Sequence, residues 1–429
     1  MNKDTFKKLA ETSLVFLDGA TGTNLQAAGM PAGICPELWI LDHASILQDL
    51  QRAYYASGSQ IVYAPTFGAS RLKLASHRVA PDETSEINRR LARLSTAVRD
   101  EFRLANPGQT YLVAGDLAPT GHFLFPTGDL SWAELTSVYR EQVRALLESD
   151  VDLFVIETMM DMGETRAAVR AVQAECNLPV LVSLTLEENG RTLSGNSMLE
   201  GIVTFASMGV SAFGLNCSFG PEKLGALLEP ILPISPIPLL VKPNAGLPCL
   251  IDGKTVFPMD PQSFAEAMKP LAAKGVRLFG GCCGATPAHI QALARTMTAV
   301  SLDRAEQSDS SLPGLPAMIC AARRTWLVES LDNVLMAECS DPDSLIDDVY
   351  ELIDDDPPAI CLDLDAAVSD DRSFDAIAEA LQQLQVMIQT PLIFRSENPI
   401  LIERLLEVYN GRAGIQTSQQ VNLHGALKL

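Results

Sequence analysis

Residues 153–183, LFVIETMMDMGETRAAVRAVQAECNLPVLVS, contain the pattern that decides the fold. An uninterrupted apolar run at 153–156 is followed by polar residues, by a helical spacing of apolar residues over 164–174, and by a second apolar run at 180–183. Apolar runs without alternation are typical of strands buried on both faces. The segment therefore predicts two parallel strands joined by a helix.

The same unit recurs from the N-terminus to about residue 300. Helical patterns, such as those over 134–147 and 287–298, alternate with apolar runs. The eight runs lie at 14–17, 60–63, 111–114, 153–156, 180–183, 212–215, 239–242 and 276–279. Eight β/α units in about 300 residues predict a (β/α)8 TIM barrel, and a doubly wound sheet is the alternative.

Polar and glycine-rich residues follow every one of these runs. The eight segments read DGATGTN, APTFGAS, GDLAPTG, ETMMD, SLTLEENGRT, NCSFG, KPNAG and GGCCG. The catalytic groups of TIM barrels lie on the loops at the C-terminal ends of the strands. Eight such ends meeting at one rim indicate a single composite site, which favours the barrel over the doubly wound sheet.

A second region follows the barrel. Residues 301–318 are rich in Ser, Asp, Gln, Pro and Gly without apolar periodicity and are expected to be a linker between the barrel (1–300) and residues 319–429. The second region predicts a smaller, incomplete α/β domain. Its expected strands lie at 334–337, 359–363, 391–394 and 413–416, and its expected helices around 344–353, 374–388 and 399–408.

Composition excludes several classes of protein. The 429 residues include 32 Lys and Arg against 53 Asp and Glu, and the net charge of −21 argues against nucleic-acid binding, which depends on cations that neutralise phosphates. No run of 18 apolar residues predicts a membrane span, and the N-terminus does not resemble a signal peptide. We therefore expect a cytoplasmic protein without a disulfide framework, despite nine cysteines.

Three cysteines stand at two predicted strand ends. Cys217 follows the sixth run, and the adjacent Cys282 and Cys283 follow the eighth. Neighbouring residues of a regular strand point to opposite faces, so both sulfurs of the pair can reach one ion only where the strand ends. Three thiolates select Zn²⁺ or another soft metal, and three protein ligands leave a fourth position open, as in catalytic sites.

Two other interpretations of these cysteines remain open at this point. Buried Cys often behaves as a small core residue, which is the expected role of Cys35, Cys176, Cys249, Cys320, Cys339 and Cys361. The adjacent pair is also compatible with a strained redox disulfide.

Eight motifs, taken together and in order, resemble the homocysteine S-methyltransferase family. They are DGATGT (18–23), PTFGA (65–69), GDLAPTG (115–121), ET (157–158), GRTLSG (190–195), GLNCS (214–218), PNAG (243–246) and GGCCG (280–284). The resemblance extends over about residues 16–293 and is strongest to the homocysteine-binding barrel of cobalamin-dependent methionine synthase.

This resemblance implies a zinc-dependent methyl transfer to homocysteine that gives methionine. It implies that Cys217, Cys282 and Cys283 bind Zn²⁺, that the homocysteine sulfur takes the open position, and that Asn244 can fill this position without substrate. It also places Asp18 and Glu157 in the amino-acid site.

The amino-acid end of homocysteine needs further contacts. Gly19, Ala20 and Gly22 are expected to offer backbone N–H groups to its carboxylate, and Glu157 a carboxylate to its ammonium group. Asn216 is expected to orient a thiolate.

The resemblance leaves the methyl donor open. The chain lacks a cobalamin-binding motif of the Asp-x-His-x-x-Gly type, so we expect it to bind no corrinoid and to receive the methyl group from a separate corrinoid protein. S-methylmethionine or betaine as donor, or a non-catalytic homocysteine- and zinc-binding subunit, are the alternatives.

The C-terminal region resembles half of the pterin-binding barrel of methionine synthase. It departs from that pattern at 363–365 (DLD) and 394–396 (FRS), so pterin binding is expected to be lost or incomplete. A half barrel leaves strand edges open. We expect the first domain, or a second copy in a homodimer, to cover them.

Overall fold

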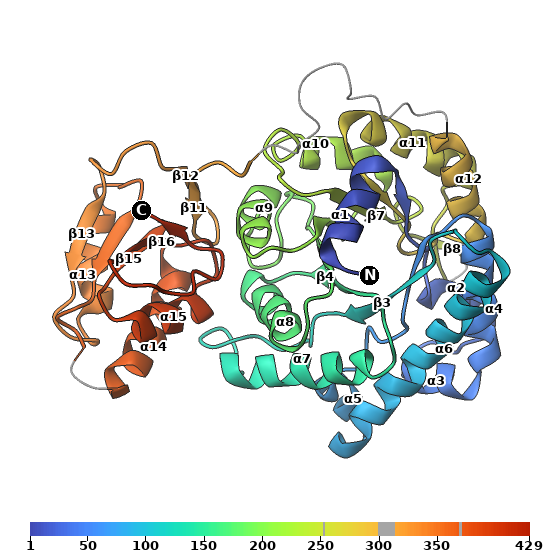
Figure 1. Ribbon diagram of the computed structural model, residues 1–429, viewed down its shortest axis with the longest axis horizontal. Coiled ribbons are helices and arrows are strands. Elements are labelled where there is room, and N and C mark those ends of the chain that lie inside the picture. Colours follow the sequence, from blue (N-terminus) through green and yellow to red (C-terminus); the bar gives the residue numbers. More distant parts are fainter. Residues whose placement is uncertain (252–253, 299–313, 369–370) are drawn as a thin grey trace.

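The computed structural model describes residues 1–251, 254–298, 314–368 and 371–429. It confirms the barrel, in which a parallel eight-stranded sheet has the order β1-β10-β7-β6-β5-β4-β3-β2 (Figure 1). The strands are β1 (Val15–Phe16), β2 (Ile61–Tyr63), β3 (Leu112–Leu117), β4 (Leu153–Met159), β5 (Val180–Leu184), β6 (Ala212–Cys217), β7 (Leu239–Pro243) and β10 (Leu278–Phe279). All eight predicted runs are strands. The ring closes where Leu17 bridges Ile61 in parallel.

Helices surround this sheet as the sequence pattern predicts. Those that follow the strands are α2 (Gly22–Ala27), α3 (Pro36–Asp42), α4 (Ala44–Ala56), α5 (Arg71–Ser76), α6 (Thr84–Ala105), α7 (Trp132–Leu147), α8 (Met162–Glu175), α9 (Met198–Ser207), α10 (Leu224–Leu228), α11 (Pro261–Lys274) and α12 (Pro287–Met297), with short 3-10 turns at Pro81–Glu83 and Pro221–Lys223. Within the described residues, no helix is both long and apolar enough to cross a bilayer.

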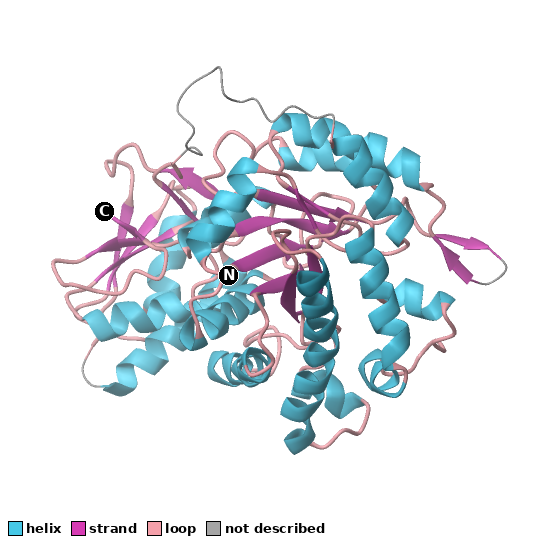
Figure 2. Cartoon of the chain, turned by 45° about the vertical axis from the view of Figure 1, so that its right-hand side comes forward, coloured by secondary structure: helices cyan, strands magenta, loops and turns pink. Residues whose placement is uncertain are grey.

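The barrel interior is apolar toward the N-terminal ends of the strands. Inward side chains such as Leu112, Ala114, Leu153 and Val155 form one cluster with Phe6 of helix α1 (Lys3–Thr12), which packs across this end. The polar strand ends therefore meet at the opposite end, where the site is expected. A hairpin that the sequence pattern did not predict, β8 (Cys249–Ile251) and β9 (Lys254–Val256), follows β7 and projects from the barrel (Figure 2).

The C-terminal region contains a five-stranded parallel sheet in sequence order. Its elements are β13 (Leu335–Glu338), α13 (Leu345–Ile353), β14 (Ile360–Asp363), α14 (Asp371–Met387), β15 (Leu392–Arg395), α15 (Pro399–Val408), β16 (Gly414–Gln416) and β17 (Leu427–Lys428). The four predicted strands and three predicted helices are present. The two-residue β17 and the hairpin β11 (Met318–Cys320) and β12 (Thr325–Leu327) were not predicted, because such short strands carry little periodicity. Most of the expected linker, residues 301–313, lies outside the described residues.

The two regions pack against each other through α8, α9, α15 and the β11–β12 hairpin. Buried Arg166 of α8 donates through its guanidinium to the carbonyl oxygens of Leu406 (2.6 Å) and Tyr409, and so satisfies carbonyls at the C-terminal end of α15. Buried Cys320 of β11 contacts Thr204 of α9, with 3.3 Å between sulfur and hydroxyl oxygen. These contacts involve helices and a hairpin rather than the edge strand β13, so the homodimer stays a prediction.

Arg166→Met is expected to destabilise the packing between the two regions. The substitution leaves buried carbonyls without a donor, at a cost of about 1 to 3 kcal/mol for each carbonyl. Chemical unfolding measures the loss of free energy of unfolding. Arg140→Met is the matched control, because its partly exposed ion pair with Glu175 is worth about 1 kcal/mol or less. Equal losses in the two variants would contradict this assignment.

Candidate metal and amino-acid site

The three predicted cysteine ligands lie together at the mouth of the barrel. The sulfur atoms of Cys217, Cys282 and Cys283 are all within 4.8 Å of one another, and each residue is half-buried. Strand β10 ends at Phe279, so the adjacent cysteines lie in a turn and can face one point, as the sequence analysis expected. All nine cysteines of the chain are free thiols.

The backbone beside the sulfurs is strained. Cys217, at the end of β6, has a φ of 52° and Ser218 a φ of 56°, in the left-handed region that side chains other than glycine rarely occupy. Thr158, next to Glu157 on β4, has a φ of 60°, which is costly for a β-branched residue. Near the sulfurs, this backbone strain lies at the ends of β4 and β6.

The proximity of the three thiols separates their pKa values. Hydrogen bonds from Cys217 and Cys282 lower the pKa of Cys283, whereas hydrogen bonds with Cys282 and Cys283 raise that of Cys217. For Cys282, the hydrogen bond with Cys217 lowers the pKa, but Cys283 and burial outweigh it and raise the pKa to about 11. Without a cation, the cluster therefore favours a single thiolate that its neighbours stabilise.

The loop that carries the cysteine pair is attached to the loop after β1. The Ala20 N–H donates to the Ala285 carbonyl (2.9 Å), and the Tyr54 hydroxyl contacts the same oxygen at 3.1 Å. A Cβ at Gly19 would come within 2.6 Å of the Tyr54 hydroxyl oxygen, so only glycine fits there. The Ala20 amide is thus engaged within the protein, whereas Gly22, at the start of α2, has open space beside it.

The two asparagines of the site have different partners. The Asn244 Oδ1 accepts from the Cys283 N–H (3.1 Å), so the atom proposed as a metal ligand also shapes the cysteine turn. Asn216 is fully buried, and its Oδ1 accepts from the Thr158 N–H and the Ser183 hydroxyl, both at 2.8 Å. Its Nδ2 lies 3.5 Å from Glu157 Oε2 and 4.0 Å from Cys282 Sγ. Asn216 therefore connects the carboxylate to the thiol cluster.

A buried lysine, which sequence reasoning missed, lies beneath these residues. Lys242 Nζ is 2.7 Å from Asp18 Oδ1 and 3.8 Å from the centre of the Tyr63 ring, and the Tyr63 N–H donates to Asp18 Oδ2 (2.8 Å). Both oxygens of Asp18 are thus engaged inside the barrel. The sequence could have revealed this buried lysine, because Lys242 stands in an otherwise apolar strand. It comes two residues after the inward-facing Leu240 and so points to the interior as well.

Two further carboxyl groups face this interior. Burial raises the pKa of Glu157 to about 7, although Lys242 lowers it. Burial, and then the charge of Glu157, raises the pKa of Asp116 well above its ordinary value. Asp116 is the second residue that sequence reasoning missed, although its motif, GDLAPTG, was identified. The mouth of the barrel thus combines three sulfur donors, suited to a soft metal, with buried carboxyls suited to a cationic group.

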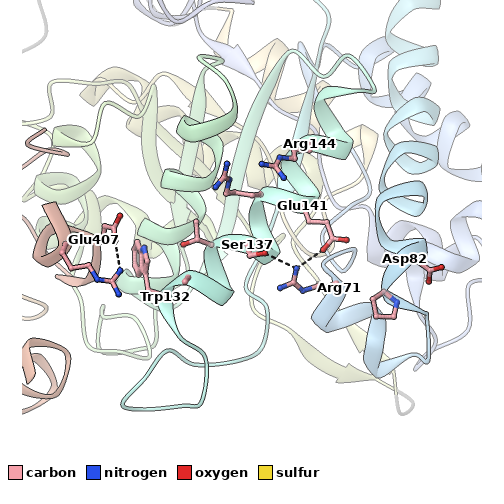
Figure 3. Close-up of a pocket in the computed structure, with 12 residues that line it drawn as sticks. Arg71, Asp82, Trp132, Ser137, Glu141, Arg144 and Glu407 are labelled. Atoms are coloured by element: carbon pink, nitrogen blue, oxygen red, sulfur yellow. Dashed lines mark hydrogen bonds and ion pairs between the residues drawn. The ribbon is translucent and has the colours of Figure 1, made fainter. Parts of the chain in front are cut away.

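A separate groove lies on the outer face of α7 and against α15 and has a volume of about 760 Å³ (Figure 3). Its arginines are each paired with a carboxylate: Arg71 with Glu141, Arg140 and Arg144 with Glu175, and Arg404 with Glu407. These pairs neutralise the arginine charges of the groove.

Glu157→Gln is expected to change how stability depends on pH. The folded protein keeps the Glu157 proton up to about pH 7, whereas the unfolded chain releases it near the ordinary value of 4.5. As pH rises through this window, the wild type therefore loses free energy of unfolding relative to the variant, by about 1.4 kcal/mol per pH unit. Urea unfolding of both metal-free proteins across this range measures the difference. A constant difference would refute the raised pKa.

Comparisons with known proteins agree with this geometry. The family described as homocysteine S-methyltransferase matches residues 15–297. Methionine synthase of Mycobacterium tuberculosis is 31% identical over 316 residues, and that of Mycobacterium leprae 32% over 303 residues. These matches cover 71% and 68% of this chain but only 26% and 25% of the relatives, so the chain spans about a quarter of their length.

A solved structure of a homocysteine methyltransferase is also similar to this chain. The metallated homocysteine methyltransferase MmuM from Escherichia coli superimposes with a TM-score of 0.57 at 26% identity, over 66% of this chain and 96% of that one. Because the family match covers well over half of the sequence, including every motif of the site, the chain belongs to the homocysteine S-methyltransferase family.

Proposed function

We propose that this chain is a zinc-dependent homocysteine S-methyltransferase that produces methionine. The observation that carries the proposal is the convergence of three sulfur atoms within 4.8 Å at the barrel mouth. A tetrahedral site with Zn–S bonds of about 2.3 Å separates its sulfurs by about 3.8 Å, so the cluster is suited to this ion. Cys217, Cys282 and Cys283 would hold it.

Zn²⁺ held by these cysteines would lower the pKa of the substrate thiol, so that homocysteine would react as a thiolate near neutral pH. The residues of the chain bind and orient the amino acid. Glu157 would accept the ammonium group, and Asn216, whose Nδ2 is 3.5 Å from Glu157 Oε2 and 4.0 Å from Cys282 Sγ, lies between this carboxylate and the cysteines. A Cβ at Gly22 would meet nothing within 4 Å, so the first turn of α2 leaves room beside it for the carboxylate.

The chemical step is a simple displacement. The homocysteine sulfur forms a bond to the methyl carbon, and the bond from that carbon to the donor breaks with its electron pair leaving on the donor. The thiol proton would already have been released to solvent on binding, so no general base would be needed at this step. The absence of histidine from the eight motifs agrees with this scheme.

The rim around the cysteines supports a large donor. Seven large apolar side chains are exposed in the described part of the barrel. Phe67, Phe123, Leu193 and Leu247 lie on loops that directly follow strands, and Leu250 lies in strand β8 of the hairpin after β7. Ile34 lies between α2 and α3, and Leu104 at the end of α6. An apolar rim suits a protein-bound corrinoid better than a small charged donor. We therefore propose methylcobalamin on a separate protein as the donor.

Zinc-edge X-ray absorption tests the metal and the acceptor together. The purified protein is expected to contain about one zinc per chain with three sulfur ligands, and addition of homocysteine is expected to add a fourth. Cys217→Ala, Cys282→Ala and Cys283→Ala are each expected to remove zinc and activity without unfolding the barrel.

Cys176→Ala is the matched control, because this half-buried thiol at the end of α8 lies outside the cluster and should retain zinc. Loss of the fold in all three cluster variants would indicate a structural metal site instead. A zinc-loaded protein that gains no sulfur ligand from homocysteine would refute the proposed acceptor.

The donor is tested at the rim. Leu247→Asp combined with Leu250→Asp is expected to slow methyl transfer from methylcobalamin about tenfold or more, since each leucine contributes about 1.5 to 3 kcal/mol when its apolar surface is covered. Zinc content and homocysteine affinity should be unchanged. Leu104→Asp, an equally drastic change away from the rim, should have no effect. Turnover with S-methylmethionine but not with methylcobalamin would overturn the donor assignment.

A further inference from the structure

Asp116 and Glu157 lie on the neighbouring strands β3 and β4, with Asp116 nearer the N-terminal ends of the strands. The register of β3 and β4 pairs Asp116 with Val155, two residues before Glu157. Leu112 and Ala114 of β3, and Leu153 and Val155 of β4, belong to the interior cluster, and side chains alternate along a strand. Asp116 and Glu157 therefore both direct their carboxyl groups to the interior from neighbouring strands.

One carboxyl oxygen of Asp116 lacks a hydrogen-bond partner. Its side chain is only 4% exposed, and its Oδ1 is buried without a hydrogen-bond partner. By contrast, its backbone oxygen accepts from the Thr66 hydroxyl at 2.8 Å. Most buried polar atoms of folded proteins are hydrogen-bonded, so an unpaired carboxyl oxygen beside a binding site calls for a missing partner.

The charges inside the barrel mouth indicate the chemical nature of the missing partner of Asp116. Three carboxyl groups, Asp18, Asp116 and Glu157, interact with the buried cation Lys242, and the charge of Lys73 also acts on Asp116. Lys242 is already engaged by Asp18 at 2.7 Å and by the Tyr63 ring. Burial raises the pKa values of Asp116 and Glu157 more than the neighbouring lysines lower them, and the charge of Glu157 raises that of Asp116 further. A positive charge in direct contact with the two carboxyl groups would offset this.

We propose that Asp116 is a second carboxylate contact of the substrate ammonium group, below Glu157, and makes the site selective for thiols that carry an α-amino group. This inference rests on the proposed function, because it assumes that the sulfur of the same molecule lies at the cysteine cluster. Asn216, which lies between Glu157 and Cys282, links the two ends of such a ligand.

The test compares homocysteine with the mercaptobutanoate that lacks only the amino group. Calorimetry with zinc-loaded protein gives the dissociation constant of each ligand for the wild type and for Asp116→Asn, which keeps the shape and removes the charge. The variant is expected to bind homocysteine about tenfold to about a hundredfold more weakly, as for the loss of a charged hydrogen bond. Its affinity for the amino-free thiol should change less than about threefold.

Glu164→Gln serves as the matched control. Glu164 is also a buried carboxyl, but its Oε1 accepts from the Thr120 N–H (2.7 Å) and the Tyr139 hydroxyl (3.0 Å) away from the cysteines. This variant should lose stability and keep the selectivity between the two ligands.

The outcomes separate this inference from the proposed function. If Asp116→Asn binds both ligands with equally reduced affinity, or both as tightly as the wild type does, Asp116 does not contact the ammonium group and the inference is wrong, while the proposed function stands. If the zinc-loaded wild type binds neither ligand, the proposed function fails and the inference fails with it.

Discussion

The ion pair between Lys242 and Asp18 is the interaction on which the site depends. In the sheet, β10 lies between β1 and β7, so the pair connects the two neighbours of the strand that leads to the cysteine pair. The backbone of Gly280 lies close to both partners of this ion pair. A Cβ at this position would come within 2.9 Å of the Lys242 side chain. Removing one partner of a buried pair costs about 3 to 5 kcal/mol, because the other charge is left uncompensated. The pair thereby holds the start of the GGCCG turn.

This arrangement explains why the proposed amino-acid site and the cysteine cluster form one unit. Asp18 belongs to the loop whose next residues contact Ala285, beyond the cysteine pair. Lys242 belongs to the strand that continues into Asn244, which accepts from the Cys283 N–H. The strained residues Thr158 and Cys217 lie at the ends of β4 and β6, further along the same ring of strand ends, and Asn216 connects those two strands. The three sulfurs therefore depend on contacts around the whole barrel.

The C-terminal region also reaches this ring. The turn of its β11–β12 hairpin contacts the loop after β5, where the Asn196 side chain donates to the Ala322 carbonyl. In the same loop, Ser194 donates to the Met160 carbonyl, close to the end of β4 (3.0 Å). A continuous apolar cluster joins the barrel helices to the small sheet. The incomplete sheet is thus packed onto the barrel and supports one of its rim loops.

The sequence by itself determined the barrel, its eight strands and the three cysteines, because buried parallel strands read as continuous apolar runs and the motifs stand at their ends. It also indicated most of the second region, apart from the short β11, β12 and β17. Only the tertiary structure decided which polar groups meet. The engaged amide of Ala20, the Lys242–Asp18 pair and the unpartnered Asp116 depend on strand register and on contacts between residues more than 40 positions apart. Local periodicity cannot encode such contacts, because it records which face of a strand is buried but not what lies across the barrel.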